Sequence, residues 1–360
     1  MDLSGNWAGH REIEGPRLEE NRFVISVTYH DDLKEVQGDP VLAALLDAPN
    51  ARAPFDRLAW WRLLETHGGL TPLIAVARQG DSRAVLALTR KGRRIEALAN
   101  WYSFTVRPLV TAGADARALL TELARDLAGE APRITLAQVP DEHGEARLLA
   151  EAFRKAGWLV EMAPCDVNHH LTVGRRSFAE FLASRPGPLR TTLKRRGGKV
   201  ACEVLTHFDA AVWDEYEAIY RESWKPEEGS PAMLRAFAEA EGAAGRLRLG
   251  VARADGVAVA AQMWTVEAGT AFIHKLAHRE SARALSPGTS LSAAMFAQVI
   301  DGDNVAAVDF GTGDNPYKRD WMDGVRPRYR LDMLRPGWPG NWPAIARMLA
   351  RRLVGAGRNG

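Results

Sequence analysis

Cysteine is nearly absent from this chain of 360 residues, which contains only Cys165 and Cys202. Two cysteines cannot build the disulfide framework of a small secreted domain, and they lack the paired spacing of a structural zinc site. Long apolar runs are missing as well, since no segment approaches the ~18 uninterrupted apolar residues that a membrane-spanning helix needs. We therefore expect a reducing compartment and no integral membrane association.

Excess charge of either sign is also lacking, because 47 lysine and arginine residues balance 45 aspartate and glutamate residues. Bulk charge thus favours neither nucleic acid nor an anionic membrane as a partner, although a local basic patch still could. The first residues, Met-Asp-Leu-Ser-Gly-Asn-Trp, show no basic region followed by an apolar stretch, as a secretion signal would. We expect a cytoplasmic protein.

Hydrophobic residues make up 46% of the sequence, which is ample for a core, and the length favours two domains. Apolar periodicity predicts the same order in both halves: helices, a three-strand antiparallel meander, a helix and a strand. The meanders span residues 73–99 and 247–276, and a strand over 158–162 closes the first half. Segments 75–78 (Ala-Val-Ala-Arg) and 250–253 (Gly-Val-Ala-Arg) also match. Four letters alone leave chance similarity open, but the shared order favours an internal duplication.

A small-residue turn joins the last meander strand of the second half to a helix. Its residues are Ser286, Pro287, Gly288, Thr289 and Ser290. The first N–H groups of a helix are unpaired and the dipole is positive there, so this turn could hold a pyrophosphate. The alternative is an ordinary helix start that Ser286 caps and Pro287 begins.

A second unusual segment follows the next apolar strand. It runs from Asp309 through Gly311 and Gly313 to Tyr317 and Lys318. A carboxylate that leaves a buried strand needs a partner, and glycines weaken regular structure, so this segment suggests a site. The alternative is a structural ion pair between Asp309 and Lys318.

Together these segments resemble the BioF-like and CelD-like acetyltransferases, which are relatives of the Fem-type transferases and have two GNAT folds in tandem. The resemblance covers nearly the whole chain, and further parts of it lie in segments 55–61, 100–103, 178–199, 223–225 and 321–329. It implies an α+β fold of two tandem GNAT-like domains with mixed, mainly antiparallel sheets. We place these domains at residues 1–165 and 166–360, with the donor on the second and the acceptor in the groove between them.

The resemblance also implies acyl transfer from acyl-CoA as cosubstrate, with residues 286–290 on the pyrophosphate. Asp309 would be the general base or would orient the acceptor, Lys318 would hold a phosphate or the developing negative charge, and Tyr317 would move a proton or line the cleft. One departure concerns the donor loop, because Leu285 stands where the common GNAT loop has a glutamine or arginine. This leaves a different donor open, including an aminoacyl-tRNA.

Other residues are candidates for the acceptor side. The basic run that contains Arg195 and Arg196 is either a solvated helix face or a rim for an anionic acceptor. The further candidates, some of them from the resemblance, are Trp101, Tyr102, Trp224, Lys225 and Arg328. His274 and His278 flank the donor strand and either titrate or pack. Cys165 and His169 lack a matching second pair of ligands, so we expect no metal.

The leading interpretation is an N- or O-acyltransferase that acts on a small-molecule or glycan acceptor, a carbohydrate or cell-envelope precursor. An aminoacyl-tRNA-dependent ligase of the Fem type, with tRNA as partner, is the second. The third is a non-catalytic subunit of a polysaccharide-synthesis complex. The C-terminal segment places Ile345, Met348 and Leu349 on one helical face, which favours docking on its own domain over attachment to a membrane surface.

Overall fold

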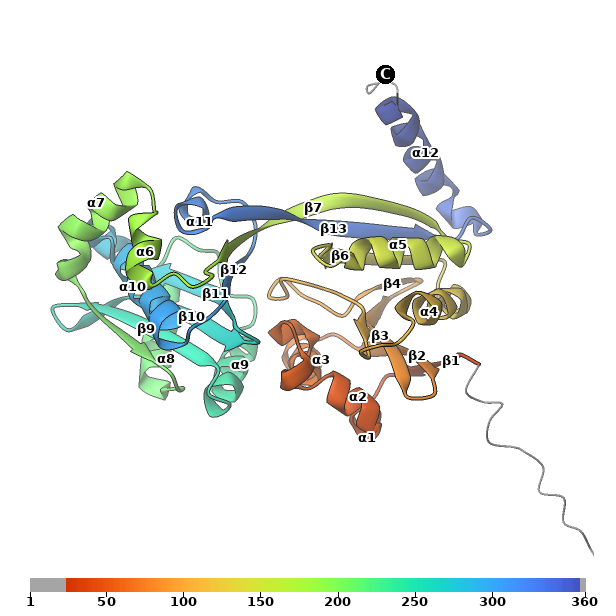
Figure 1. Ribbon diagram of the computed structural model, residues 1–360, viewed down its shortest axis with the longest axis horizontal. Coiled ribbons are helices and arrows are strands. Elements are labelled where there is room, and N and C mark those ends of the chain that lie inside the picture. The colour runs from red at the N-terminus through yellow and green to blue at the C-terminus, as the bar shows by residue number, and fades with distance from the viewer. Residues whose placement is uncertain (1–23, 357–360) are drawn as a thin grey trace, which may run out of the picture.

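A computed structural model describes residues 24–356 (Figure 1). The strands of the first half are β1 (Ser26–His30), β2 (Pro72–Gln79), β3 (Ser82–Lys91), β4 (Arg94–Ala97), β5 (Leu109–Val110), β6 (Arg133–Val139) and β7 (Leu159–Thr172). Its helices are α1 (Leu33–Gly38), α2 (Pro40–Leu45), α3 (Leu58–Gly68), α4 (Ala116–Glu130) and α5 (Glu145–Lys155).

The second half follows with a similar set of elements. Its strands are β8 (Ala201–Leu205), β9 (Leu247–Ala254), β10 (Val257–Glu267), β11 (Thr270–His278), β12 (Ala307–Thr312) and β13 (Gly324–Leu334). Its helices are α6 (Phe178–Ala183), α7 (Gly187–Arg196), α8 (Ala210–Arg221), α9 (Pro231–Ala243), α10 (Pro287–Ala297), α11 (Pro316–Trp321) and α12 (Trp342–Ala356).

The two halves share one topology, as the duplicated pattern predicts. In each half, a helix follows the antiparallel meander and leads to a strand that pairs in parallel with the last meander strand. These parallel pairs are β4 with β6 and β11 with β12. The matching segments 75–78 and 250–253 lie in β2 and β9, the first strands of the two meanders. The mixed, mainly antiparallel pairing is therefore confirmed.

The halves are joined into one sheet, because each contributes its last strand to the other. The strand order is β1-β2-β3-β4-β6-β13-β7-β12-β11-β10-β9-β8, and β5 pairs with β3 beside this path. β13 pairs with β6, where Leu334 lies opposite Arg133, and β7 pairs with β12. The sequence pattern predicts a strand only over residues 158–162, but β7 continues to Thr172 because β13 and β12 pair along it. The predicted boundary at residue 165 falls inside β7 (Figure 1).

Helices cover both faces of the sheet, and one apolar cluster is common to the two halves. α3 of the first half packs against α9 of the second, with Trp60 edge-on to Phe237 at 4.9 Å between ring centroids. Beside them the buried guanidinium of Arg57 pairs with Glu241 at 2.9 Å. The interface between the halves is thus part of the core.

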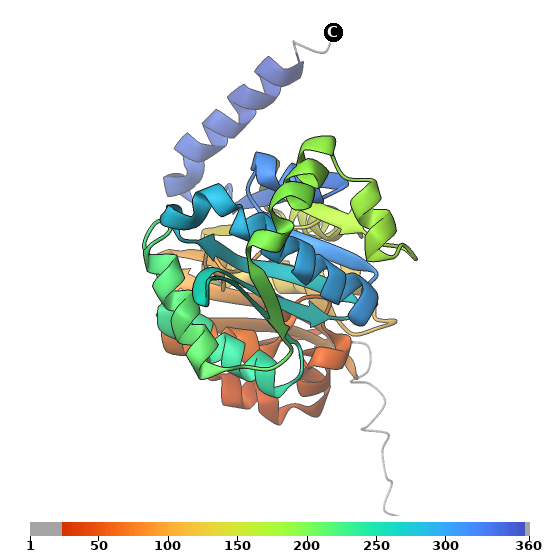
Figure 2. The same cartoon turned by 90° about the vertical axis from the view of Figure 1, so that its left-hand side faces the viewer.

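Helix α12 stands away from the rest of the molecule (Figure 2). Its Met348 is buried and Arg351 pairs with Glu161 at 3.3 Å, while Trp342 and Leu349 are exposed. The helix therefore contacts its own protein over only part of its apolar face. In the described part of the chain, every helix is too short or too polar to traverse a lipid bilayer.

Candidate active site

Strands β11 and β12 lie side by side only where they begin. Their parallel pairing ends at Phe272 and Asp309, and residues 273–278 and 310–312 then line one pocket of about 950 Å³. Gly311 lies in this gap with φ +64°, and a side chain there would come within 3.0 Å of the Phe104 ring, so the position requires glycine. Because the strands separate, their backbone N–H and C=O groups face a space that a ligand can fill.

The beginning of α10 forms another wall of this pocket. Ser286, Gly288 and Thr289 line it, whereas Pro287 and Ser290 do not. The side chain of Ser286 makes no capping hydrogen bond to the helix, and its Oγ accepts a hydrogen bond from Nη1 of Arg196 at 3.0 Å. A Cβ at Gly288 would meet nothing within 4 Å. The first turn therefore opens onto the pocket, as an anion site requires.

Positive charge dominates the pocket. Glu280 is the acidic lining residue, against five cations: Arg196, Lys225, Lys275, Arg283 and Lys318. The two histidines add no charge, because burial and the charge of Lys275 lower the pKa of His274 to about 3 and burial lowers the pKa of His278. The lining thus suits a ligand that carries several negative charges.

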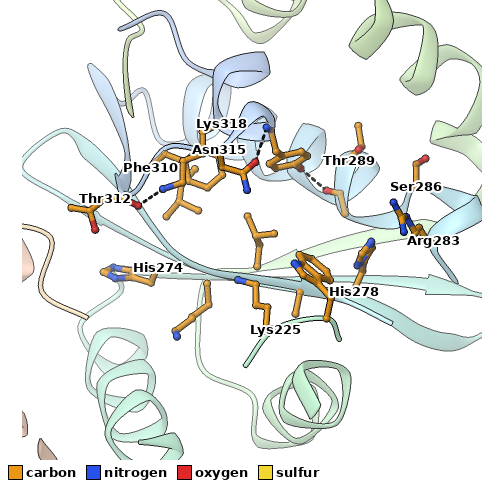
Figure 3. Close-up of a pocket in the computed structure, with 18 of the residues that line it drawn as sticks. Lys225, His274, His278, Arg283, Ser286, Thr289, Phe310, Thr312, Asn315 and Lys318 are labelled. Carbon is orange, nitrogen blue, oxygen red and sulfur yellow. Dashed lines mark hydrogen bonds between the residues drawn. The ribbon is translucent and has the colours of Figure 1, made fainter. Parts of the chain in front are cut away.

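Lys318 lies in this pocket opposite Lys225 and His274 (Figure 3), and the adjacent Tyr317 lines the same pocket. The Tyr317 hydroxyl lies 2.8 Å from Oγ of Ser292, and burial raises its pKa to about 12, so it stays protonated near neutral pH. Nζ of Lys318 donates to the carbonyl oxygen of Thr312 at 2.5 Å, and burial lowers its pKa. Tyr317 can therefore give a proton, and Lys318 places a cation at the gap between the strands.

Asp309 lies apart from these two residues, on the other face of β12. Its buried carboxylate accepts hydrogen bonds from the Gly311 amide at 2.8 Å, from Asn168 at 2.7 Å and from Arg326 at 2.9 Å. It lines a separate cavity together with Arg328, which is 1% exposed and pairs with Glu142 at 2.5 Å. The structure therefore does not bring Asp309 or Arg328 to the pocket. Lys318 bonds a carbonyl instead of pairing with Asp309, so the structural ion pair between them is not formed either.

The remaining predicted residues divide in the same way. Trp101, Trp224, Lys225 and Arg196 line the pocket, whereas Tyr102 lines a smaller cavity beside it. Arg195 is exposed and does not line the pocket. Trp101 lies so close to Gly229 that any side chain at position 229 would overlap its ring.

Four charged residues of the site are absent from the prediction, one of them Glu280 in the pocket wall. Arg283 lines the pocket three residues before Ser286, and Lys275 lines it from β11. Nζ of Lys275 pairs with Glu228 at 2.8 Å, and Glu228 also accepts a hydrogen bond from Tyr102 at 2.6 Å. The available signal for Arg283 and Lys275 is their position in the segments that flank the helix start; Glu228 has no comparable signal.

Arg195 and Arg196 provide a matched pair of variants. Because only Arg196 lines the pocket, Arg196→Gln should weaken binding of a polyanionic ligand such as CoA about tenfold, and Arg195→Gln should change it little. Calorimetric titrations with CoA at low and high salt measure both effects. Equal losses in the two variants would indicate a diffuse electrostatic effect.

Comparison with known families agrees with this geometry. Residues 189–319 match the model of an acetyltransferase (GNAT) domain. The chain has a GNAT fold. The matched residues contain β11, α10, β12 and the first four residues of α11, all of which line the pocket. A comparison with curated proteins finds no match to the sequence.

Solved structures show the same fold over most of the chain. FemX matches with a TM-score of 0.60 and 11% identity over 86% of this chain and 98% of its own. A tandem GNAT protein from the clavulanic acid biosynthesis pathway matches with a TM-score of 0.52 and 15% identity over 86% of this chain and 98% of its own. L-PGS from Bacillus licheniformis matches with a TM-score of 0.50 and 13% identity over 82% of this chain and 96% of its own. The expected tandem GNAT architecture is therefore confirmed.

Proposed function

We propose that the protein moves an acyl group from acyl-CoA to an amine or hydroxyl of a carbohydrate or cell-envelope precursor. The observation that carries this proposal is the pocket between the separated strands β11 and β12. It combines an open helix start, a surplus of cations and the gap between the two strands in one space. A thioester supplies a reactive carbonyl and a good leaving group, so the protein mainly has to position the reactants.

The residues of the pocket support distinct roles. The first turn of α10, with Arg196 and Arg283, would hold the pyrophosphate. Leu285, which stands where the common GNAT loop has a glutamine or arginine, carries no charge, and these two arginines would supply the positive charge instead. Lys318 would stabilise the negative charge that develops on the carbonyl oxygen. Tyr317 would give its proton to the leaving sulfur.

Calorimetric titration with acetyl-CoA and longer acyl-CoAs tests this function. We expect saturable binding of at least one of them, followed by release of free thiol when an acceptor is added. If none binds, the acyl-CoA proposal is wrong. The aminoacyl-tRNA-dependent ligase or the non-catalytic subunit would then be favoured.

Gly288→Val tests the donor site itself. The new side chain would point into open space, so the fold should survive, but it would occupy the room that a phosphate needs near the first-turn amides. We expect acyl-CoA binding to weaken at least about tenfold with an unchanged melting temperature. Gly129→Val is a suitable control, since Gly129 also faces open space and lies in α4. Tight binding by Gly288→Val would contradict the pyrophosphate assignment.

A further inference from the structure

A further cavity, of about 460 Å³, adjoins the donor pocket, and we call it the acceptor chamber. Its walls come from α8, the beginning of α9 and the segment 225–228 between these helices. Lys225 lines both the donor pocket and the acceptor chamber. The two spaces therefore meet at this side chain.

The acceptor chamber is richer in carboxylates than the donor pocket. Glu217, Glu227 and Glu228 line it together with Arg221 and Lys225. Glu228 pairs with Lys275, so Glu217 and Glu227 are the two lining carboxylates for which the described chain supplies no ion pair. In the donor pocket, five cations outnumber one carboxylate. A negatively charged donor is thus favoured on one side of Lys225, and a positively charged ligand on the other.

A buried phenol in the chamber wall lacks a partner. Tyr216 is 2% exposed, it lines the chamber, and its hydroxyl has no hydrogen-bond partner within residues 24–356. A buried hydroxyl without a partner is unfavourable, so a ligand that supplies one would be stabilised here. Tyr220 adds a second phenol to the same wall.

Lys225 differs from the other two lysines of the donor pocket. Lys275 pairs with Glu228, and Lys318 donates to a backbone carbonyl. In the described chain the ammonium group of Lys225 has neither an ion pair nor a hydrogen bond, and it lies 5.9 Å from the ring centroids of Tyr220 and Trp224. Burial and the charge of Lys275 lower its pKa to about 8. A neutral amine is therefore accessible at this position near neutral pH.

We propose that the acceptor chamber binds a primary ammonium group on a compact polar body such as an amino sugar, and that Lys225 takes a proton from it. The proposal rests on the proposed function. Neutral Lys225 accepts one proton, the acceptor nitrogen forms a C–N bond with the thioester carbonyl carbon, and the C–S bond breaks. The leaving sulfur takes the proton of Tyr317, which gives a thiol. The second N–H proton of the acceptor restores the Tyr317 hydroxyl, and Lys225 releases its proton to water.

Binding to the chamber can be measured without any donor, so this test does not depend on acyl-CoA. Glucosamine and glucose differ by an ammonium group in place of a hydroxyl. We expect glucosamine to bind at least about tenfold more tightly at pH 7, and the double variant Glu217→Gln/Glu227→Gln to remove this preference. Glu215→Gln is the control, because Glu215 lies on the same helix but pairs with Arg253 at 2.6 Å. Equal affinity for both sugars, no binding, or a preference that survives in the double variant would overturn the chamber assignment.

The role of Lys225 is tested by Lys225→Arg, which keeps the positive charge but cannot lose its proton. We expect nearly unchanged acetyl-CoA binding, a kcat for glucosamine that falls about 10²-fold, and loss of the wild-type rise of kcat/KM with pH. Lys155→Arg on α5 is the exposed control. A wild-type rate and pH profile in Lys225→Arg would overturn the assignment. Should neither acetyl-CoA nor a longer acyl-CoA bind the wild type, the proposed function fails, while the sugar titration still decides the chamber.

Discussion

Lys318→Met should lower the single-turnover rate by about 10²–10³-fold while the protein remains folded, because a cation at the gap between β11 and β12 would stabilise charge that develops only during the reaction. Acceptor affinity should fall as well if the acceptor carries a phosphate. Rates and melting curves of the purified variant measure the two effects separately.

Arg319→Met is the matched control for this variant. Arg319 lies on the same helix, but it pairs with the exposed Asp314 and does not line the pocket. It should leave the rate within about twofold, since surface ion pairs contribute little. A wild-type single-turnover rate in Lys318→Met would remove Lys318 from the catalytic group.

Asp309→Ala should lower the free energy of unfolding by about 3–5 kcal/mol, because it removes a buried carboxylate that pairs with Arg326 and accepts hydrogen bonds from Asn168 and Gly311. Glu142 remains as a partner of Arg326 and Arg328. Asp309→Asn should cost less, since it keeps the size and the polarity. Chemical denaturation of both variants measures these losses.

Activity of the Asp309 variants separates a structural role from a catalytic one. Loss of a general base typically lowers turnover by about 10²–10⁴-fold. With the carboxylate bound by Gly311, Asn168 and Arg326, we expect turnover per folded molecule in Asp309→Asn to stay within about tenfold of wild type. A larger loss at unchanged stability would restore Asp309 as a catalytic candidate.

The elements of the site can be predicted from local patterns, because the formation of each element depends on residues that are neighbours in the sequence. The alternation of β9 to β11, the small residues where α10 begins and the adjacent Tyr317 and Lys318 are all readable within short windows. The structure places β11, the beginning of α10 and the Tyr317–Lys318 pair around one pocket. The duplicated order of elements also depends only on periodicity and turns.

Side-chain direction and long-range pairing were harder to predict. Asp309 precedes Phe310 in β12, and successive side chains of a strand point to opposite faces, so only Phe310 reaches the pocket. This alternation could have shown from the sequence that Asp309 and Phe310 point to opposite faces of the sheet. The exchange of β7 and β13 has no local signal, because it depends on which edges remain unpaired after the rest of the sheet has formed.

The exchanged strand β13 has a consequence for synthesis of the protein on the ribosome. β6 pairs with β4 on one side, but its other partner in the sheet begins only at Gly324. At typical rates of ~5–20 residues per second, the intervening chain takes about 10–40 s to be made. During this interval the first half has an open strand edge, which is a template for pairing with other chains. The nascent protein should therefore need a chaperone more than its finished core suggests.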